Sequence, residues 1–419
     1  MSPDISPDMK YVILQDIRER TNRVAREEAM NKISIHMPLL ALTLALGAGT
    51  SRAADPLQPY PVKGQVVQRL NAFDNPEGAI FSADGQFVFV SNSADIGTPD
   101  KGLHWTHKAG YISKLSVQPD GSLKMVNEKL ITGLTGPLGM AVIPVATKKF
   151  PAGTIFVIEA WAPLAEADGT EVKDPSVVDP KIIGFNADGK VLGSIKLGAG
   201  SSAAKAAGVS ATLGNALAFD KEGNLYAIDT GVAGGLFDPP IATKGGGAYM
   251  FPAASLDALA DGQSATVSYI ATPEGGPDGI EVAPDGMIHF NTVGPVAGLK
   301  DPADGGMYRV TKEDFKNGKL PAPFAQGLGG LDGLDFAGNI RLDTEIKNTN
   351  SVVVTPPSGK PMMLTYDKEI TLAGPADIAV RKLSDGTYLL VIPELAATSP
   401  NKSDNPVTVV RLPANFDRP

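Results

Sequence analysis

Residues 212–231 read TLGNALAFDKEGNLYAIDTG, and this stretch decides the fold. Two apolar runs, at 216–219 and 225–228, flank a turn that contains Asp220 and Gly223. Short apolar runs on either side of a Gly-containing turn are typical of a β-hairpin. We therefore predict two antiparallel strands joined by a tight turn.

The same pattern recurs along the chain, so the hairpin is one unit of a repeat. Further copies occupy residues 75–92 (NPEGAIFSADGQFVFVSN), 136–159, 276–291 (GPDGIEVAPDGMIHFN), 330–343 (GLDGLDFAGNIRLD) and 374–393 (GPADIAVRKLSDGTYLLVIP). The copies start roughly 45–80 residues apart. Repeats of this period that consist of strands indicate a β-propeller or another closed array.

Each hairpin is followed by a third strand-like segment, and Asp-Gly or Ser-Gly turns after several of these lead to a fourth. The third segments are residues 111–117, 181–185, 247–251, 306–310, 351–355 and 407–412. The sequence therefore predicts an all-β chain that forms a six-bladed β-propeller with four-stranded blades. The last blade lacks a fourth strand after residue 412, and residues 65–70 (QVVQRL) can supply it. An N-terminal strand in this place would close the ring and remove open sheet edges.

Composition limits the classes of partner and of chemistry. The net charge is −9 and no basic cluster is present, which argues against a nucleic-acid partner. The chain has no cysteine, so disulfides, thiolate metal sites and cysteine nucleophiles are excluded. We expect a monomer that binds a small molecule.

Residues 30–53 have the order of regions typical of a secretory signal peptide. Lys32 supplies the positive charge, residues 39–46 are mostly apolar, and Ser51 and Ala53 stand at positions −3 and −1 of a cleavage site. The apolar core is shorter than the roughly 20 residues that a membrane-spanning helix needs. We therefore expect a periplasmic or secreted protein without stable membrane insertion.

Residues 1–29 precede this segment and are polar with mixed charge. We interpret them as a spurious or disordered extension that arises from an upstream start codon. The alternative is a genuine extension, which would make the apolar segment an internal anchor. In either case we expect residues 54–419 to form a single propeller domain.

Polar side chains open most of the innermost strands, next to the predicted central channel. Around the ring these positions are Glu77, Leu138, Asn215, Asp278, Asp332 and Asp377. Carboxylates that converge in a channel raise one another's pKa unless a cation lies among them. Oxygen ligands without Cys or His suit a hard cation, Ca²⁺ first, with Mg²⁺ or Mn²⁺ as alternatives. The competing interpretation is turn chemistry at strand entries, which does not suit Glu77.

A second polar set lies where the second strands are expected to end: Asn92, Glu159, Asp229, Asn291, Asp343 and Glu394. These side chains either cap the long loops that follow or contact a substrate. In the first long loop, His104 and His107 are candidates for a general base or are bystanders.

Three short motifs resemble the central metal motifs of the senescence marker protein/gluconolactonase/luciferin-regenerating enzyme family. They are Pro76-Glu77-Gly78, Asn215 within GNALAF, and Pro277-Asp278-Gly279-Ile280. This family is related to paraoxonase-type lactonases and strictosidine synthase-like proteins, and the resemblance extends through the repeats over about residues 60–415.

The resemblance implies a calcium-dependent propeller that hydrolyses a lactone or related ester. It implies Glu77, Asn215, Asp278 and Asp332 as metal ligands, and either Asp278 or Asp332 as the residue that activates or positions water. The Arg and the Asn-Asp pair with which the sugar lactonases read their substrate are not recognisable, and Leu138 occupies an axial position. The alternative function is a non-catalytic propeller that binds a ligand or a protein around a structural calcium.

We predict that export removes residues 30–53 and that residues 1–29 are dispensable, because the regions of a signal peptide follow in order only from Met30. Sequencing the N-terminus of secreted protein from a gene that starts at Met30 should give Ala54 as the first residue. A mature protein that begins upstream of Leu39 would contradict this prediction.

Overall fold

The computed structural model describes residues 56–418 with gaps at 95–96, 99–101, 104, 162–163, 166–171, 173–178, 234–240, 243–245, 273–275, 294–304, 347, 358 and 396–404. The expected extension at 1–29 and signal peptide at 30–53 lie outside the described residues. Among the described residues, no helix is long and apolar enough to cross a membrane.

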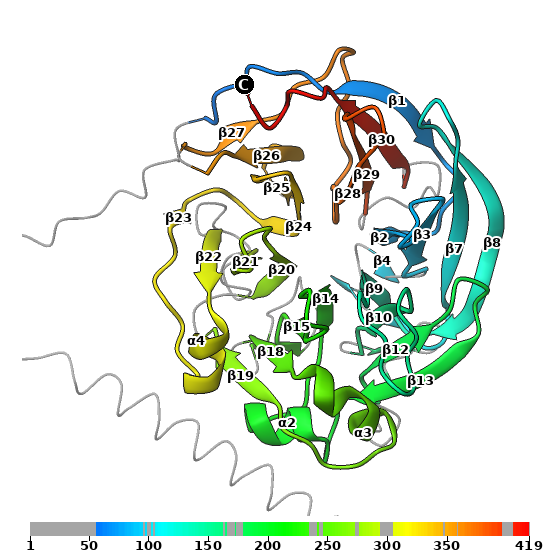
Figure 1. Cartoon of the computed structure of the whole chain (residues 1–419), viewed down its shortest axis with the longest axis vertical. Helices are drawn as coiled ribbons and strands as arrows, with labels where there is room; N and C mark the ends of the chain where they lie inside the picture. Colours follow the sequence, from blue (N-terminus) through cyan, green and yellow to red (C-terminus); the bar gives the residue numbers. More distant parts are fainter. Residues whose placement is uncertain are drawn as a thin grey trace, which may run out of the picture. The chain divides into compact units, whose positions relative to one another are not determined.

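Six four-stranded antiparallel sheets stand around a common axis (Figure 1). We number them blades 1–6 and give their strands from the axis outward. Blade 1 is β2 (Pro76–Phe81), β3 (Phe87–Asn92), β7 (Gly110–Val117) and β8 (Leu123–Leu134); blade 2 is β9 (Pro137–Val142), β10 (Ile155–Glu159), β12 (Lys181–Phe185) and β13 (Val191–Lys196); blade 3 is β14 (Gly214–Phe219), β15 (Leu225–Asp229), β18 (Gly247–Phe251) and β19 (Ser268–Ala271).

Blade 4 is β20 (Pro277–Val282), β21 (Ile288–Thr292), β22 (Gly306–Val310) and β23 (Ala325–Gln326); blade 5 is β24 (Leu331–Ala337), β25 (Ile340–Glu345), β26 (Ser351–Thr355) and β27 (Met362–Met363); blade 6 is β28 (Ala379–Lys382), β29 (Tyr388–Pro393), β30 (Val407–Leu412) and β1 (Gln65–Leu70). The predicted all-β, six-bladed propeller with four-stranded blades is therefore confirmed.

The remaining elements are short and lie in the connections. They are β4 (Gly97–Thr98), β5 (Gly102–Leu103), β6 (Trp105–Thr106), β11 (Leu164–Ala165), β16 (Val232–Ala233), β17 (Ile241–Ala242), α2 (Ser202–Ala207), η2 (Ala253–Ser255), α3 (Leu256–Ala260) and α4 (Lys312–Asn317). The small strands all follow a second strand of blades 1–3, where the sequence has its long loops.

The hydrophobic core is divided into clusters between neighbouring blades. Separate clusters join blades 1 and 2, 2 and 3, 3 and 4, 5 and 6, and 6 and 1. Strand side chains alternate between the two faces of a sheet, so each blade can pack against both neighbours. The cluster between blades 4 and 5 is the smallest, with Met307, Leu331 and Val353 as its buried members.

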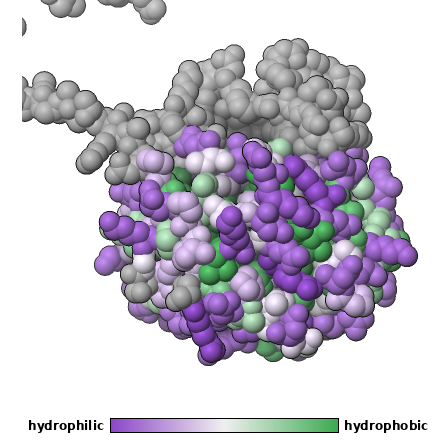
Figure 2. Space-filling model, turned by 90° about the horizontal axis from the view of Figure 1, so that it is seen from above, coloured by the Kyte–Doolittle hydropathy of each residue, from purple (hydrophilic) through white to green (hydrophobic). Residues whose placement is uncertain are grey.

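The surface shown in Figure 2 is mainly hydrophilic, with hydrophobic residues scattered among the others. Four large hydrophobic side chains among the described residues are well exposed, Val126, Val145, Val191 and Phe324. They come from separate parts of the chain. Scattered exposed hydrophobic residues are ordinary for a protein surface.

The N-terminal segment joins blades 5 and 6. The Tyr60 amide donates a hydrogen bond to the Met363 carbonyl (2.7 Å), and the Gly64 amide donates to Thr365 (2.8 Å). The chain then enters β1, which pairs antiparallel with β30 along its length. The sheet of blade 6 thus takes its outermost strand from the other end of the chain.

We predict that deleting residues 60–70 from the protein that spans 54–419 causes insolubility or a large loss of thermal stability, because the deletion exposes the edge of β30. Thermal unfolding and sedimentation measure the effect. Tyr60→Phe is the control, since it removes only the hydroxyl group that donates to the Phe416 carbonyl (3.0 Å) and should cost about 1 kcal/mol. An unchanged melting temperature after the deletion would show that residues 60–70 do not stabilise the fold.

Candidate functional site

A β-bulge opens the innermost strand of each of blades 1–5. In blade 1, Pro76 pairs with Asn92 and Ala79 with Val90, so Glu77 and Gly78 together face a single residue. The equivalent pairs are 138–139, 215–216, 278–279 and 332–333. We call the first residue of each pair the axial residue. Bulges re-aim side chains and are common beside functional sites.

The second residue of each bulge must be small. A Cβ atom on Gly78 would lie 2.5 Å from the Leu138 carbonyl oxygen, and one on Gly279 would lie 2.3 Å from that of Asp332. Gly139 and Gly333 meet the next blade in the same way, and blade 3 has Ala216. These residues let neighbouring innermost strands approach closely.

The axial assignment in blade 6 was wrong by one residue. Pro375 pairs with Glu394 as Pro76 pairs with Asn92, which makes Ala376 the axial residue and places Asp377 at the second position. The Ala376 carbonyl oxygen also lies 2.9 Å from the Cβ position of Gly333, as expected for an axial residue. The spacing from the proline was the signal available in the sequence.

The four predicted ligands are all buried at the axial positions. Glu77, Asn215, Asp278 and Asp332 are at most 8% exposed. The Asn215 amide nitrogen donates to Asp278 Oδ1, which joins blades 3 and 4. Leu138, the apolar axial residue, is 1% exposed.

Burial and neighbouring negative charges raise the pKa values of the axial residues Glu77 and Asp332. Burial raises the pKa of Glu77 well above its usual value, and the negative charges of Asp377 and Asp278 raise it further. Burial also raises the pKa of Asp332, and the charges of Asp278, Glu77 and Asp377 add to the effect. The charges of the predicted carboxylates therefore act on one another across the axis.

A second group of carboxylates lines a small cavity on the axis, and the sequence reasoning missed two of its members. Glu281, Asp335 and Asp377 contribute to the wall of this cavity of about 30 Å³, which all six blades line. The Ala79 amide donates to Asp377 (3.0 Å) and the Val380 amide donates to Asp335 (2.6 Å). Glu281 and Asp335 each stand three residues after an axial Asp, a spacing that could have identified them.

The polar residues at the strand ends mainly cap the loops that enter the innermost strands. Glu159 accepts a hydrogen bond from the Thr135 amide (2.9 Å), and Asp229 accepts one from the Leu213 amide (2.9 Å). Glu394 and Asn92 accept bonds from the amides of residues 373 and 74. These bonds go to the segments that precede the innermost strands, whereas the prediction had placed the caps on the long loops that follow the second strands. Asp229 also accepts a bond from the amide of Gly231, which follows its strand (3.2 Å).

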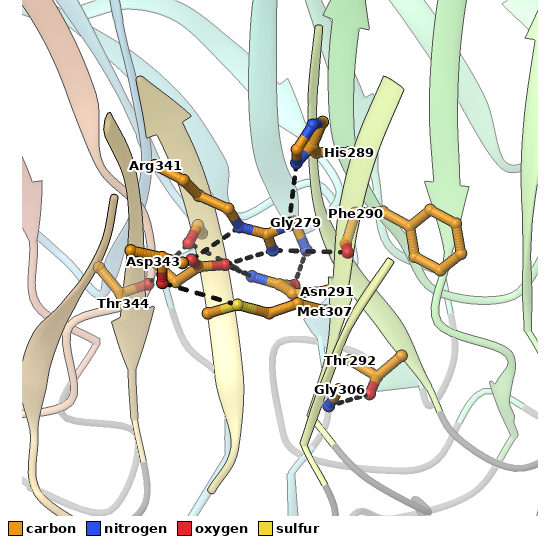
Figure 3. Close-up of polar contacts among 12 residues, drawn as sticks. Gly279, His289, Phe290, Asn291, Thr292, Gly306, Met307, Arg341, Asp343 and Thr344 are labelled. Atoms are coloured by element: carbon orange, nitrogen blue, oxygen red, sulfur yellow. Dashed lines mark hydrogen bonds and ion pairs between the residues drawn. The ribbon is translucent and has the colours of Figure 1, made fainter. Parts of the chain in front are cut away.

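The two other members of this set had been placed at strand ends, but they lie inside their strands, which continue to Thr292 and Glu345. Figure 3 shows them in a buried network between blades 4 and 5. Arg341 donates two hydrogen bonds to Asp343 (2.8 and 2.6 Å), and Asn291 donates to the same carboxylate (2.9 Å).

This network reaches the axis through Asn291. Its Oδ1 accepts a hydrogen bond from the Gly279 amide (2.7 Å), directly after axial Asp278. At the other end, Arg341 Nη1 lies 3.3 Å from His289 Nδ1. Burial, with the positive charge of Arg341, lowers the pKa of His289 to about 3. His289 is therefore neutral and accepts the bond.

The two loop histidines keep the status assigned to them from the sequence. His104 lies outside the described residues. The ring of His107 packs against that of Trp161, with centroids 5.6 Å apart. This packing does not identify His107 as a general base.

The axial residues fit a hard cation by the chemistry of their donor atoms. Glu77 Oε2 is buried and has no hydrogen-bond partner among the residues that the structure describes, which is costly for a carboxylate oxygen unless a cation or proton satisfies it. Amide and carboxylate oxygens are the ligands that Ca²⁺ prefers. Within the described residues, no three acidic or histidine side chains form a ready-made metal cluster, so the fit rests on donor chemistry.

No protein-family model and no curated protein sequence matches this chain. Solved structures with similar folds include a gluconolactonase from Xanthomonas campestris, which aligns over 86% of this chain and 99% of its own at a TM-score of 0.50 and 14% identity. A periplasmic gluconolactonase from Pseudomonas aeruginosa aligns over 81% and 85% at a TM-score of 0.41 and 14% identity. At 14% identity, the similarity to the Xanthomonas campestris structure shows a shared fold and nothing about function.

We predict that the cation-free protein becomes more stable as the pH falls from about 7 to about 4. Burial raises the pKa of Asp335 from 3.8 to about 7 and that of Asp377 from 3.8 to about 6. Between these values the folded state binds more protons than the unfolded state, so stability is lost as the pH rises. His289 acts in the opposite direction, and so do carboxyl groups whose pKa is lowered, such as Asp220, but the loss from the carboxyl groups falls mainly below about pH 4.

Thermal unfolding in the presence of a chelator, across this pH range, tests the prediction. Asp335→Asn should flatten the pH dependence because it removes one of the buried titrating groups. Asp188→Asn, in an exposed turn, is the matched control and should leave the dependence unchanged. A cation-free protein whose stability rises steadily with pH over the range would show that the buried carboxylates do not control it.

Proposed function

We propose that this chain is an exported hydrolase that depends on a divalent cation and acts on a lactone or related ester. Glu77, Asn215, Asp278 and Asp332 would hold the cation, Ca²⁺ or alternatively Mg²⁺ or Mn²⁺. The observation that carries the proposal is the recurrence of one bulge position in blades 1, 3, 4 and 5, each time with a buried oxygen-bearing side chain.

When bound, a divalent cation supplies Lewis-acid stabilisation for the negative charge that develops on the carbonyl oxygen of the substrate. The chain's own residues determine the rest. Glu77 offers a buried oxygen without a partner, and Asn215 offers a neutral amide oxygen. The apolar Leu138 leaves one side of the axis without a charged group.

The two candidate bases differ in their hydrogen bonds. Asp278 Oδ1 already accepts bonds from Asn215 and from the Thr230 hydroxyl group (3.4 Å). Asp332 makes no hydrogen bond through its side chain to the part of the chain that the structure describes. We therefore assign the role of removing a proton from water to Asp332, and the role of positioning to Asp278.

Two further observations support the proposal. The axial motifs resemble those of the gluconolactonase-containing family, and the fold resembles that of a gluconolactonase at 14% identity.

We predict that Glu77→Gln weakens Ca²⁺ binding at least about tenfold and lowers lactone hydrolysis in parallel, because the variant keeps the shape of the side chain and removes one charge. Leu138→Ala is the matched control at an axial position, and it should leave Ca²⁺ binding unchanged. Calorimetric titration of chelator-treated protein and a panel of lactones and aryl esters measure the two effects. Wild-type protein that binds stoichiometric Ca²⁺ and hydrolyses none of the panel would contradict the enzymatic role.

A further inference from the structure

Thr230 follows β15 and lies between the axial residues of blades 3 and 4. It is 3% exposed. Its hydroxyl group donates a hydrogen bond to the Pro277 carbonyl oxygen (2.8 Å) and lies 3.4 Å from Asp278 Oδ1. The Asn215 amide nitrogen lies 3.2 Å from the same hydroxyl oxygen. Thr230 therefore touches two of the four proposed ligands and the backbone between them.

A count of protons fixes how the Asn215 amide group is turned. A threonine hydroxyl has one proton to donate, and its acceptors here are the Pro277 and Asp278 oxygens. Toward Asn215 the hydroxyl group can therefore only accept, so Asn215 must present its NH₂ group. The opposite orientation would place two acceptors 3.2 Å apart and leave one of them unsatisfied in a buried place.

The second N–H of the amide is used as well, because the Asn215 nitrogen also donates to Asp278 Oδ1. Both hydrogens of the amide group are thus committed to protein acceptors. The atom left to bind a hard cation is the amide oxygen, which is the atom that Ca²⁺ requires. Groups that orient a metal ligand in this way typically change metal affinity 10–100-fold when they are removed.

We propose that Thr230 is a positioning residue that orients the Asn215 amide oxygen as a cation ligand and thereby sets the affinity of the axial site. The inference rests on the proposed cation site and deepens it. Thr230 itself supplies no ligand; it acts through Asn215.

Blade 1 contains a matched hydroxyl group that lacks this role. Ser93 occupies the position equivalent to Thr230, since its amide donates to the Asn75 carbonyl as that of Thr230 donates to Leu213. The Ser93 hydroxyl group donates to the Pro137 carbonyl oxygen (3.2 Å), just before an axial leucine. Ser93 therefore shares the bond to the next blade's backbone and has no amide to orient.

The test compares Ca²⁺ affinity, by calorimetric titration of chelator-treated protein, in wild type, Thr230→Val, Thr230→Ser and Ser93→Ala. We expect Thr230→Val to weaken binding about tenfold and Thr230→Ser to restore it. Ser93→Ala should leave affinity unchanged, although it should lower the melting temperature in chelator about as much as Thr230→Val does. Equal losses of affinity in Thr230→Val and Ser93→Ala would overturn the inference.

A double-mutant cycle with Asn215→Asp separates orientation from a general structural effect. Aspartate has two equivalent oxygens and needs no orienting partner, so Thr230→Val should have little effect on affinity in the Asn215→Asp background. The same loss in both backgrounds would show that Thr230 has only a structural role. A wild type that binds no Ca²⁺ would remove the proposed function and this inference together, whereas failure of the cycle alone leaves the proposed function standing.

Should Thr230→Val not fold, a crystal structure of the calcium-loaded wild type gives the same test without a variant. The inference is supported if Asn215 Oδ1 binds the calcium ion and the Asn215 NH₂ nitrogen lies within hydrogen-bond distance of Thr230 Oγ1. A Thr230 hydroxyl group turned away from Asn215 overturns it.

Discussion

The close approach of neighbouring innermost strands is the constraint on which the rest of the structure depends. A Cβ atom at the second bulge position of blades 1, 2, 4 or 5 would already meet the next blade, in blade 1 the Leu138 carbonyl oxygen at 2.5 Å. The same packing crowds the axial carboxylates, so that burial and mutual repulsion raise the pKa of Glu77 and Asp332. Only protons or a cation can offset such a concentration of negative charge. The architecture and the proposed chemistry therefore have one physical origin.

The interface between blades 4 and 5 departs from the apolar packing used elsewhere in the ring. Its hydrophobic cluster is small, and the Arg341–Asp343 ion pair with Asn291 occupies the space instead. Buried ion pairs contribute little net stability but are costly to break, because removal of one partner leaves the other charge unsatisfied. The network holds the Gly279 amide, and so it fixes the backbone on which Asp278 stands.

The repeats and the axial residues could be predicted from the sequence because both depend on local patterns. Apolar runs around Gly-containing turns located all six hairpins, and the residue that opens each innermost strand located Glu77, Asn215, Asp278 and Asp332. The axial position of blade 6 was assigned to Asp377 because this residue is acidic like most other axial residues. The spacing from Pro375 identifies Ala376 instead. Thr230 was missed because it stands after its strand, and its partners, Asn215 and Pro277, become neighbours only when blades 3 and 4 pack.

The pairing of β1 with β30 also determines when the molecule can be completed. The two strands come from opposite ends of the folded chain, so this sheet has the longest loop to close, and contacts of such sequence separation form slowly. During synthesis, residues 65–70 have no strand partner until residues 407–412 have been made. The sheet of blade 6 therefore forms completely only when both strands are present. A chain that lacks either strand retains an unpaired strand edge, which favours aggregation.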